Sequence, residues 1–190
     1  MRMLIVASAP NDQGREQTQL PISPPCENIL SADRPIYHYT TGEHFASIMQ
    51  TREIRPSRRG VDPPEIPAVW LSTASEWEGS ANKGVIINNL MRTATVAEMV
   101  YLCGCLIRIR INPARTWLIP PSGLKSALCV PDRIFSHLVV AGRQMGANPQ
   151  DWWASALPIP ASAFISVEYS VETSPIKWIC CQTLTQAMIA

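Results

Sequence analysis

Proline is the residue that most constrains this chain. The 190 residues include 17 prolines, whereas an average protein contains about 5% proline. Proline lacks an amide hydrogen and clashes with the preceding helical turn, so it interrupts helices and the middle of sheets. The prolines are distributed over most of the chain. The sequence therefore predicts short strands, short helices and many loops rather than a bundle of long helices.

The composition predicts a globular chain without a polybasic surface. Hydrophobic residues make up 46% of the chain and charged residues only 16%, which excludes a chain that is disordered throughout. At this length we expect one core, or at most a domain and a tail. Sixteen lysines and arginines against 15 acidic residues leave a formal net charge of +1. Proteins that bind nucleic acid through phosphate contacts carry a clear positive surplus, so this class is disfavoured.

The domain organisation follows from where periodic patterns begin. Residues 1–33 have no helical or strand period, so we expect a loosely ordered N-terminal arm in which Met3 to Ala7 could add a strand. Residues 34–190 are expected to form a single domain. No run approaches about 18 apolar residues, so no membrane span is expected. The six cysteines lack metal-finger spacing. We therefore expect reduced thiols, no metal site and a cytoplasmic protein.

Period-2 patterns predict the strands. Between residues 105 and 111, apolar residues alternate with Arg108 and Arg110. A similar pattern at 165–171 places Ile165, Val167, Tyr169 and Val171 towards the core and Ser166, Glu168 and Ser170 on the polar face. Further short strands are expected at 36–39, 68–72 and 176–181.

Capping signals predict the helices. Thr40 with Glu43 has the spacing of a capping box before a helix over 41–51, and Thr95 with Glu98 forms a second possible cap. Asn148–Pro149 predicts a helix from there to about Leu157. Residues 134–140 fit a strand or a helix, and residues 75–82 fit a turn or a short helical piece. The sum is an α+β fold with a mainly antiparallel or mixed sheet and a few short helices.

Four groups of residues could carry chemistry, and each also has a purely structural interpretation. His38, at a strand end, could bind a ribose hydroxyl or act as an acid or base. Trp70 and Ser72 could supply a stacking face and a hydroxyl. Glu168 and Glu172 share one strand face, and Arg52, Arg55, Arg58 and Arg59 form a positive cluster suited to phosphate. The structural alternatives are a core histidine, a buried tryptophan, a solvated sheet face and a solvated loop.

The order of these groups resembles the ADP-ribosyltransferase superfamily. The closest branch is the one with a His, Tyr and Glu signature, which includes diphtheria-type toxins, poly-ADP-ribose polymerases and, in the broader fold, DNA-targeting toxins. Tyr37-His38-Tyr39-Thr40 resembles the first motif and Val69-Trp70-Leu71-Ser72-Thr73 the second. Ser80-Ala81-Asn82-Lys83 is similar to a Ser-Ala-Asn-Tyr segment of the polymerases, and Glu168-Tyr169 to the third motif. Trp70 and Lys83 each stand where that branch has Tyr.

The resemblance implies a split antiparallel or mixed sheet and an activity in which NAD is the substrate. The enzyme would cleave NAD and pass ADP-ribose to a macromolecular acceptor, a protein or a nucleic acid, as toxins and effectors do. Glu168 and His38 are the implied catalytic residues, because a carboxylate stabilises the developing ribosyl cation. The expected NAD contacts are His38, Tyr39, Thr40, Trp70 and Ser72, with Arg58 and Arg59 contacting phosphates from a lid at 55–67.

The sequence is also compatible with two other functions. One is an RNA 2′-phosphotransferase of the same fold, for which the arginines at 52–59 would serve the phosphate. The other is a catalytically inactive module that uses the same groove to bind a nucleotide or a protein.

The absence of a periodic apolar pattern in the N-terminal arm predicts that its removal has little effect on stability. Deletion of residues 1–30 should leave the thermal transition nearly unchanged, because this segment has no apolar stripe to bury. The measurement is thermal unfolding of the full and truncated chains. A loss of more than about 2 kcal/mol would instead identify residues 3–7 as a buried strand, because an effect of that size requires burial.

Overall fold

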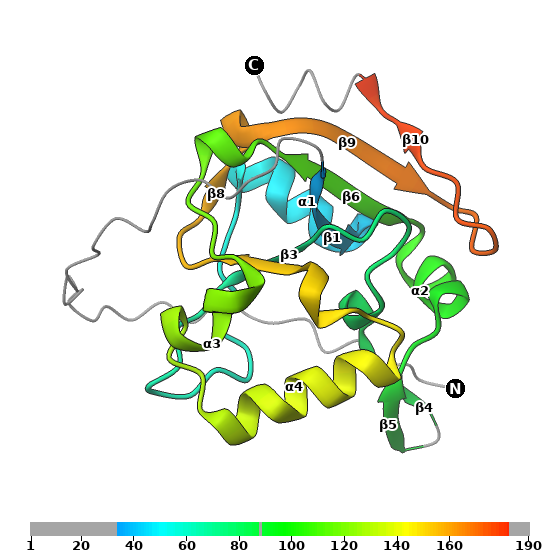
Figure 1. The fold of residues 1–190 in the computed structure, drawn as a ribbon. Coiled ribbons are helices and arrows are strands. Elements are labelled where there is room, and N and C mark those ends of the chain that lie inside the picture. The colour runs from blue at the N-terminus through cyan, green and yellow to red at the C-terminus, as the bar shows by residue number, and fades with distance from the viewer. Residues whose placement is uncertain (1–33, 88, 183–190) are drawn as a thin grey trace.

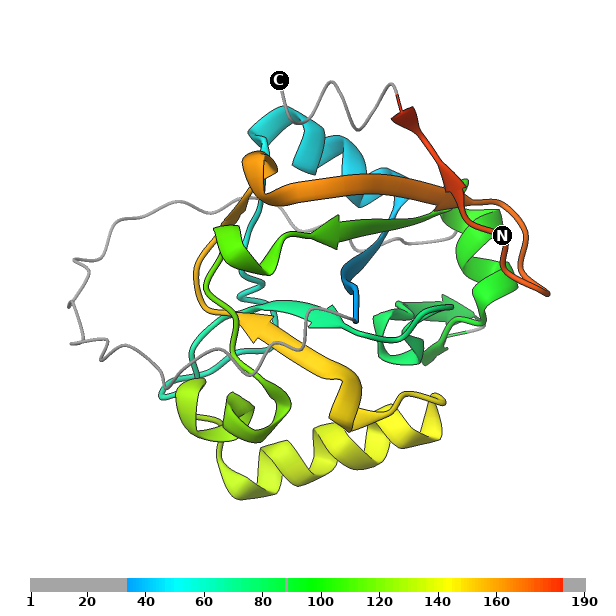
Figure 2. The same ribbon diagram turned by 45° about the horizontal axis from the view of Figure 1, so that its top comes forward.

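The computed structural model describes residues 34–87 and 89–182. The N-terminal arm expected at 1–33, and with it the possible strand at 3–7, lies outside the described residues. Figures 1 and 2 show a curved central sheet with helices on both sides.

The main sheet has six strands in the order β10-β9-β6-β1-β3-β7, and every neighbouring pair is antiparallel. This confirms the α+β class with a mainly antiparallel sheet. Two small antiparallel pairs, β2 with β8 and β4 with β5, lie outside it. The strands are β1 (Ile36–Thr41), β2 (Glu53–Ile54), β3 (Val69–Ser72), β4 (Gly84–Ile87), β5 (Leu90–Thr93), β6 (Leu106–Ile111), β7 (Trp152–Ser155), β8 (Ile159–Pro160), β9 (Phe164–Ser170) and β10 (Ile179–Cys180).

The helices are short, as the proline content predicts. They are α1 (Gly42–Thr51), α2 (Val96–Cys103), α3 (Leu124–Ala127) and α4 (Asp132–Gln144). Within the part of the chain that the structure describes, five single turns of 3-10 helix connect other elements: η1 (Gly79–Ala81), η2 (Pro113–Arg115), η3 (Pro121–Gly123), η4 (Pro149–Asp151) and η5 (Ala161–Ala163). The segment 134–140, which the sequence left open between strand and helix, belongs to α4.

The alternation at 105–111 produces the main core. Ile107, Ile109 and Ile111 of β6 are buried on one face of the sheet, where they pack in one cluster with Phe45 and Ile48 of α1. A second cluster lies on the opposite face under β7, where Trp152 and Ala154 pack with residues of α3 and the α3–α4 connection. The sheet is therefore covered on both faces (Figure 2).

Of the two predicted capping boxes, one forms. Thr95 Oγ1 accepts from the Glu98 amide at 3.2 Å, and a carboxylate oxygen of Glu98 accepts from the Thr95 amide at 2.8 Å, so α2 begins as expected. The prediction of a capping box at Thr40 and Glu43 is wrong. β1 continues to pair with β6 through Thr41, so Thr40 is a buried strand residue and the helix begins after Thr41 without a side-chain cap.

The predicted helix at 148–157 is also wrong. Asn148 does cap a helical turn, because its side chain accepts from the Gln150 amide, but that turn ends at Asp151. The chain then enters β7, which pairs with β3 over four residue pairs. The ladder with β3 and the burial of Trp152 and Ala154 outweigh the local helix signal.

The strand β9 departs from strict alternation at its start. An irregularity between Arg110 and Ile111 makes Ile111 pair with Phe164. Phe164 thus takes the core position expected for Ile165, which is exposed. Val171 is exposed as well, because β9 ends at Ser170. Both residues were expected in the core, and both expectations are wrong.

The contact between α4 and β7 yields a stability prediction. A Cβ added to Gly142 of α4 would lie 2.6 Å from Cη2 of the Trp152 ring. Gly142→Ala should therefore destabilise the protein by about 1–3 kcal/mol through overpacking, although alanine ordinarily stabilises a helix interior by about 1 kcal/mol. Gly84→Ala, with nothing within 4 Å of its added Cβ, is the control. Chemical denaturation measures both, and a stabilised Gly142→Ala variant contradicts the packing.

Candidate functional site

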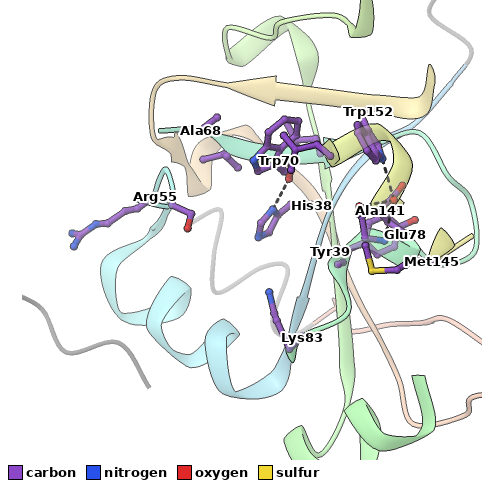
Figure 3. A pocket seen from close by; sticks show the side chains of 16 residues that line it. His38, Tyr39, Arg55, Ala68, Trp70, Glu78, Lys83, Ala141, Met145 and Trp152 are labelled. Atoms are coloured by element: carbon purple, nitrogen blue, oxygen red, sulfur yellow. Dashed lines mark hydrogen bonds between the residues drawn. The ribbon is translucent and has the colours of Figure 1, made fainter. Parts of the chain in front are cut away.

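A pocket lies where the backbone pairing between β1 and β3 ends. These strands share a single residue pair, Tyr37 with Ser72. Next to it is a cavity of about 360 Å³, lined by residues of β1, β3, α4 and the segment between β3 and β4 (Figure 3). This volume lies within the range of about 300–1,000 Å³ typical of small-molecule sites. The lining residues are His38, Tyr39, Arg55, Ser57, Ala68, Val69, Trp70, Leu71, Glu78, Ser80, Ala81, Lys83, Leu138, Ala141, Met145 and Trp152.

The side chain of His38 connects β1 to the backbone of β3 at a position where the two strands form no backbone pair. Its Nδ1 lies 2.9 Å from the Trp70 carbonyl oxygen. A carbonyl can only accept, so Nδ1 carries the proton and the neutral ring has its lone pair on Nε2. Burial lowers the pKa of His38 to about 4, which keeps the ring neutral at physiological pH. Nε2 can therefore accept a hydrogen bond from a ligand hydroxyl in the pocket.

Glu78 supplies a buried carboxylate in the pocket wall. Only 6% of the residue is exposed. It accepts from Ser72 Oγ at 2.7 Å, Ser80 Oγ at 2.7 Å, the Ser80 amide at 3.3 Å and Trp152 Nε1 at 3.1 Å. All four donors are neutral, and within 34–87 and 89–182 no cation forms an ion pair with Glu78. When ionised, Glu78 thus presents an uncompensated negative charge to the pocket.

Trp70 presents an aromatic face beside this carboxylate. The residue is 39% exposed and contacts the Trp152 ring edge-on, with 6.2 Å between ring centroids. Leu138, Ala141 and Met145 of α4 line the pocket as well. The pocket therefore offers an aromatic and an apolar wall to a planar ring.

Two cations lie at the pocket. Lys83 points towards His38 in Figure 3. Desolvation lowers the pKa of the Lys83 ammonium, and the positive charge of Arg59 lowers it further. Arg55 is largely exposed and pairs with Glu53 at 2.7 Å. Both side chains suit an anionic group such as a phosphate.

Three of the site residues expected from the sequence are brought together, namely His38, Tyr39 and Trp70. The hydroxyl of Tyr39 donates to the Ala74 carbonyl, and burial raises the pKa of this phenol, so it stays protonated. Ser72 is fully buried behind the pocket, where it holds Glu78. Thr40 is buried in β1 and is not a lining residue. Arg58 and Arg59 are exposed in the loop at 55–67. From this loop, Arg55 and Ser57 line the pocket, whereas Arg58 and Arg59 do not.

Glu168 lies on the sheet but not among the residues that line the pocket. The register aligns Glu168 with Arg108 of β6 and, one strand further, Tyr39 of β1. Two strand spacings separate its backbone from β1 by about 10 Å. Its carboxylate pairs with Arg108, whose Nε lies 2.7 Å away. Glu172, the other candidate, lies beyond β9 and pairs with Lys177 at 3.0 Å.

No periodic pattern in the sequence points to Glu78. It lies in the segment 75–82, whose composition predicts a turn or a short helical piece, and η1 at 79–81 agrees with that prediction. A loop glutamate is ordinarily solvated, and only the contacts of Glu78 with Ser72 and Trp152 show that it is buried.

The comparisons with known proteins found no match: no family model, no curated protein and no solved structure matches this chain. Among residues 34–87 and 89–182, no group of three or more His, Cys, Asp or Glu side chains could hold a metal ion. The described helices include none long and apolar enough to span a membrane. The five described cysteines are free thiols.

His38 makes stability depend on pH. Its pKa falls from 6.5 to about 4 on folding, so between these values the unfolded chain binds more protons and stability decreases as pH falls. The shift corresponds to a loss of up to about 3 kcal/mol between pH 7 and pH 4. His38→Asn, which can still donate to the Trp70 carbonyl, should remove this part of the slope in denaturation at several pH values.

His137→Asn, on the exposed surface of α4, is the matched control and should retain the slope. The pKa of His44 is also lowered by burial, so part of the slope remains in the His38 variant. Equal slopes for the wild type and His38→Asn would show that His38 does not titrate in this window.

Proposed function

We propose that this chain is an NAD-dependent ADP-ribosyltransferase and that the pocket binds the nicotinamide and ribose of NAD. The observation that carries the proposal is the uncompensated carboxylate of Glu78 in one pocket with neutral His38 and the exposed ring of Trp70. These groups match the three parts of the reacting centre: a developing cation, a ribose hydroxyl and a planar ring.

The reaction breaks the bond between the ribose and the nicotinamide ring. Positive charge develops on the ribose while the nicotinamide leaves as a neutral molecule, so a nearby carboxylate lowers the barrier. Glu78 suits this role better than Glu168, because Arg108 already compensates the charge of Glu168. His38 Nε2 would accept from a ribose hydroxyl, and Trp70 would stack on the nicotinamide.

The sheet supports the proposal as well. The resemblance to ADP-ribosyltransferases implies a split antiparallel or mixed sheet. Here β1, which carries His38, and β3, which carries Trp70, share one residue pair. The acceptor in this proposal is a macromolecule, a protein or a nucleic acid, and the protein acts in the cytoplasm.

The two cationic side chains at the pocket favour a second candidate function. Lys83 and Arg55 both line the pocket, and they would suit the phosphate of an RNA 2′-phosphotransferase substrate as well as the pyrophosphate of NAD. An inactive binding module of the same fold is the third alternative.

The proposal is tested by incubating the protein with NAD and following nicotinamide release, with and without protein and nucleic-acid acceptors. The wild type should release nicotinamide, and Glu78→Gln should lower the turnover by about 10²–10³-fold, the effect of removing one electrostatic stabiliser. Glu76→Gln, exposed in the same segment, is the matched control and should keep the activity.

Three further measurements separate a loss of folding from a loss of catalysis and distinguish the alternative functions. The thermal transition of Glu78→Gln separates lost chemistry from lost folding, because this carboxylate accepts four hydrogen bonds. Turnover that appears only with 2′-phosphorylated RNA would identify the second function. NAD binding without turnover would identify the inactive module, and no NAD binding would contradict the proposal.

A further inference from the structure

Three successive backbone carbonyls between β3 and Glu78 are each held by a side chain from a different part of the sheet. Tyr39 of β1 donates to the Ala74 carbonyl, and Arg108 of β6 donates to the Ser75 carbonyl. Trp178, in the connection from β9 to β10, donates from Nε1 to the Glu76 carbonyl at 2.8 Å. The segment 74–76 belongs to no helix or strand, so these bonds fix its path.

Arg108 is the central member of this arrangement. Its guanidinium lies 4.5 Å from the ring centroid of Tyr37 and 4.5 Å from that of Trp178. Glu168 accepts from Arg108 Nε at 2.7 Å, and the two side chains are only 12% and 15% exposed. The second carboxylate oxygen of Glu168 accepts from Ser166 Oγ at 3.0 Å. The partners of Glu168 are therefore Arg108 and its own strand, and it is not a lining residue of the pocket.

We propose that Glu168 and Arg108 are positioning residues: the pair holds the segment 74–76 so that Glu78 lies at the correct place in the pocket. This inference rests on the proposed function, because it assigns the effect of both residues to the carboxylate of Glu78. It also gives Glu168 a role that differs from the catalytic role expected from the sequence.

The physical reason lies in the cost of a nearly buried cation. Arg108 can donate to the Ser75 carbonyl from this position only if its charge is compensated, and Glu168 is the carboxylate that does so. Without Glu168, the guanidinium gains more from water than from its site between the rings. The Ser75 carbonyl then loses its donor, and Glu78, three residues further on, is free to shift. A displacement of about 1 Å at a reacting centre can cost about 100-fold in rate.

Four variants and one control test the inference in the full chain: Glu168→Gln, Arg108→Gln, the double variant, Trp178→Phe and the control Arg110→Gln. Arg110 lies two residues from Arg108 on the same strand and is exposed. The first measurement is amide hydrogen exchange over residues 74–80. The second is kcat and KM for nicotinamide release.

We expect faster exchange over 74–80 in all four variants and unchanged exchange in Arg110→Gln. Each of the two single substitutions in the pair should lower kcat by about 10- to 100-fold with little change in KM. The double variant should lose no more than the larger single effect, because the two residues act as one unit. Trp178→Phe should lower kcat too, although Trp178 does not line the pocket.

Two results would overturn the inference. One is a loss of kcat in Glu168→Gln with unchanged exchange over 74–80, which would return Glu168 to a direct role in catalysis. The other is a double variant whose loss equals the product of the single losses. If the wild type does not turn over NAD, the proposed function fails, and the exchange data still show whether the pair holds the segment. Arg108→Gln leaves the nearly buried carboxylate of Glu168 without its cation. If this variant does not fold, Glu168→Gln and Trp178→Phe decide on their own.

Discussion

The single residue pair between β1 and β3 is the constraint on which the rest of the structure depends. Backbone hydrogen bonds join β1 to β6 over six residue pairs, whereas β1 and β3 meet only at Tyr37 and Ser72. Beyond that pair, the His38 side chain of β1 binds the Trp70 carbonyl of β3. The Glu78 carboxylate accepts from Ser72 of β3 and Trp152 of β7, which are also partners in the β3–β7 ladder. The pocket thus lies where a side-chain contact, rather than a longer backbone ladder, joins β1 to β3.

The same arrangement separates two carboxylates by their surroundings. Glu168 pairs with a guanidinium, so the field of the pair falls off quickly with distance. Glu78 is held by hydroxyl, amide and indole donors, which stabilise the charge without cancelling it. A reaction that develops positive charge would profit from the second environment, because such a preorganised charge costs no reorganisation during the reaction. The aromatic residues follow this division: Trp70 borders the pocket, whereas Trp178 and Tyr37 flank Arg108.

Local patterns predicted elements well where the tertiary contacts agree with them. The alternation over 105–111 predicted β6 and its buried face, and Thr95 with Glu98 predicted the start of α2. Local helix signals failed where pairing with a neighbouring strand of the sheet competes with helix formation. Asn148–Pro149 has the features of a helix start, yet the pairing with β3 draws the next residues into β7. Thr40 has the spacing of a cap, yet its pairing with Ile107 extends β1 past it. A helix signal acts within a few residues, whereas a strand is stabilised by residues far away in the chain.

By itself, the sequence determined the α+β class, the short elements and the strands that carry His38 and Trp70, because these follow from periodicity over a few neighbouring residues. It also placed Glu168 on the polar face of its strand. Only the tertiary structure decided which carboxylate lies in the pocket. A period-2 pattern shows which face a side chain occupies but not which strand lies next to it, so it could not show that Arg108 faces Glu168. Glu78 lies in a non-periodic segment, and its burial depends on donors from β3, β7 and its own loop that meet only when the sheet is assembled.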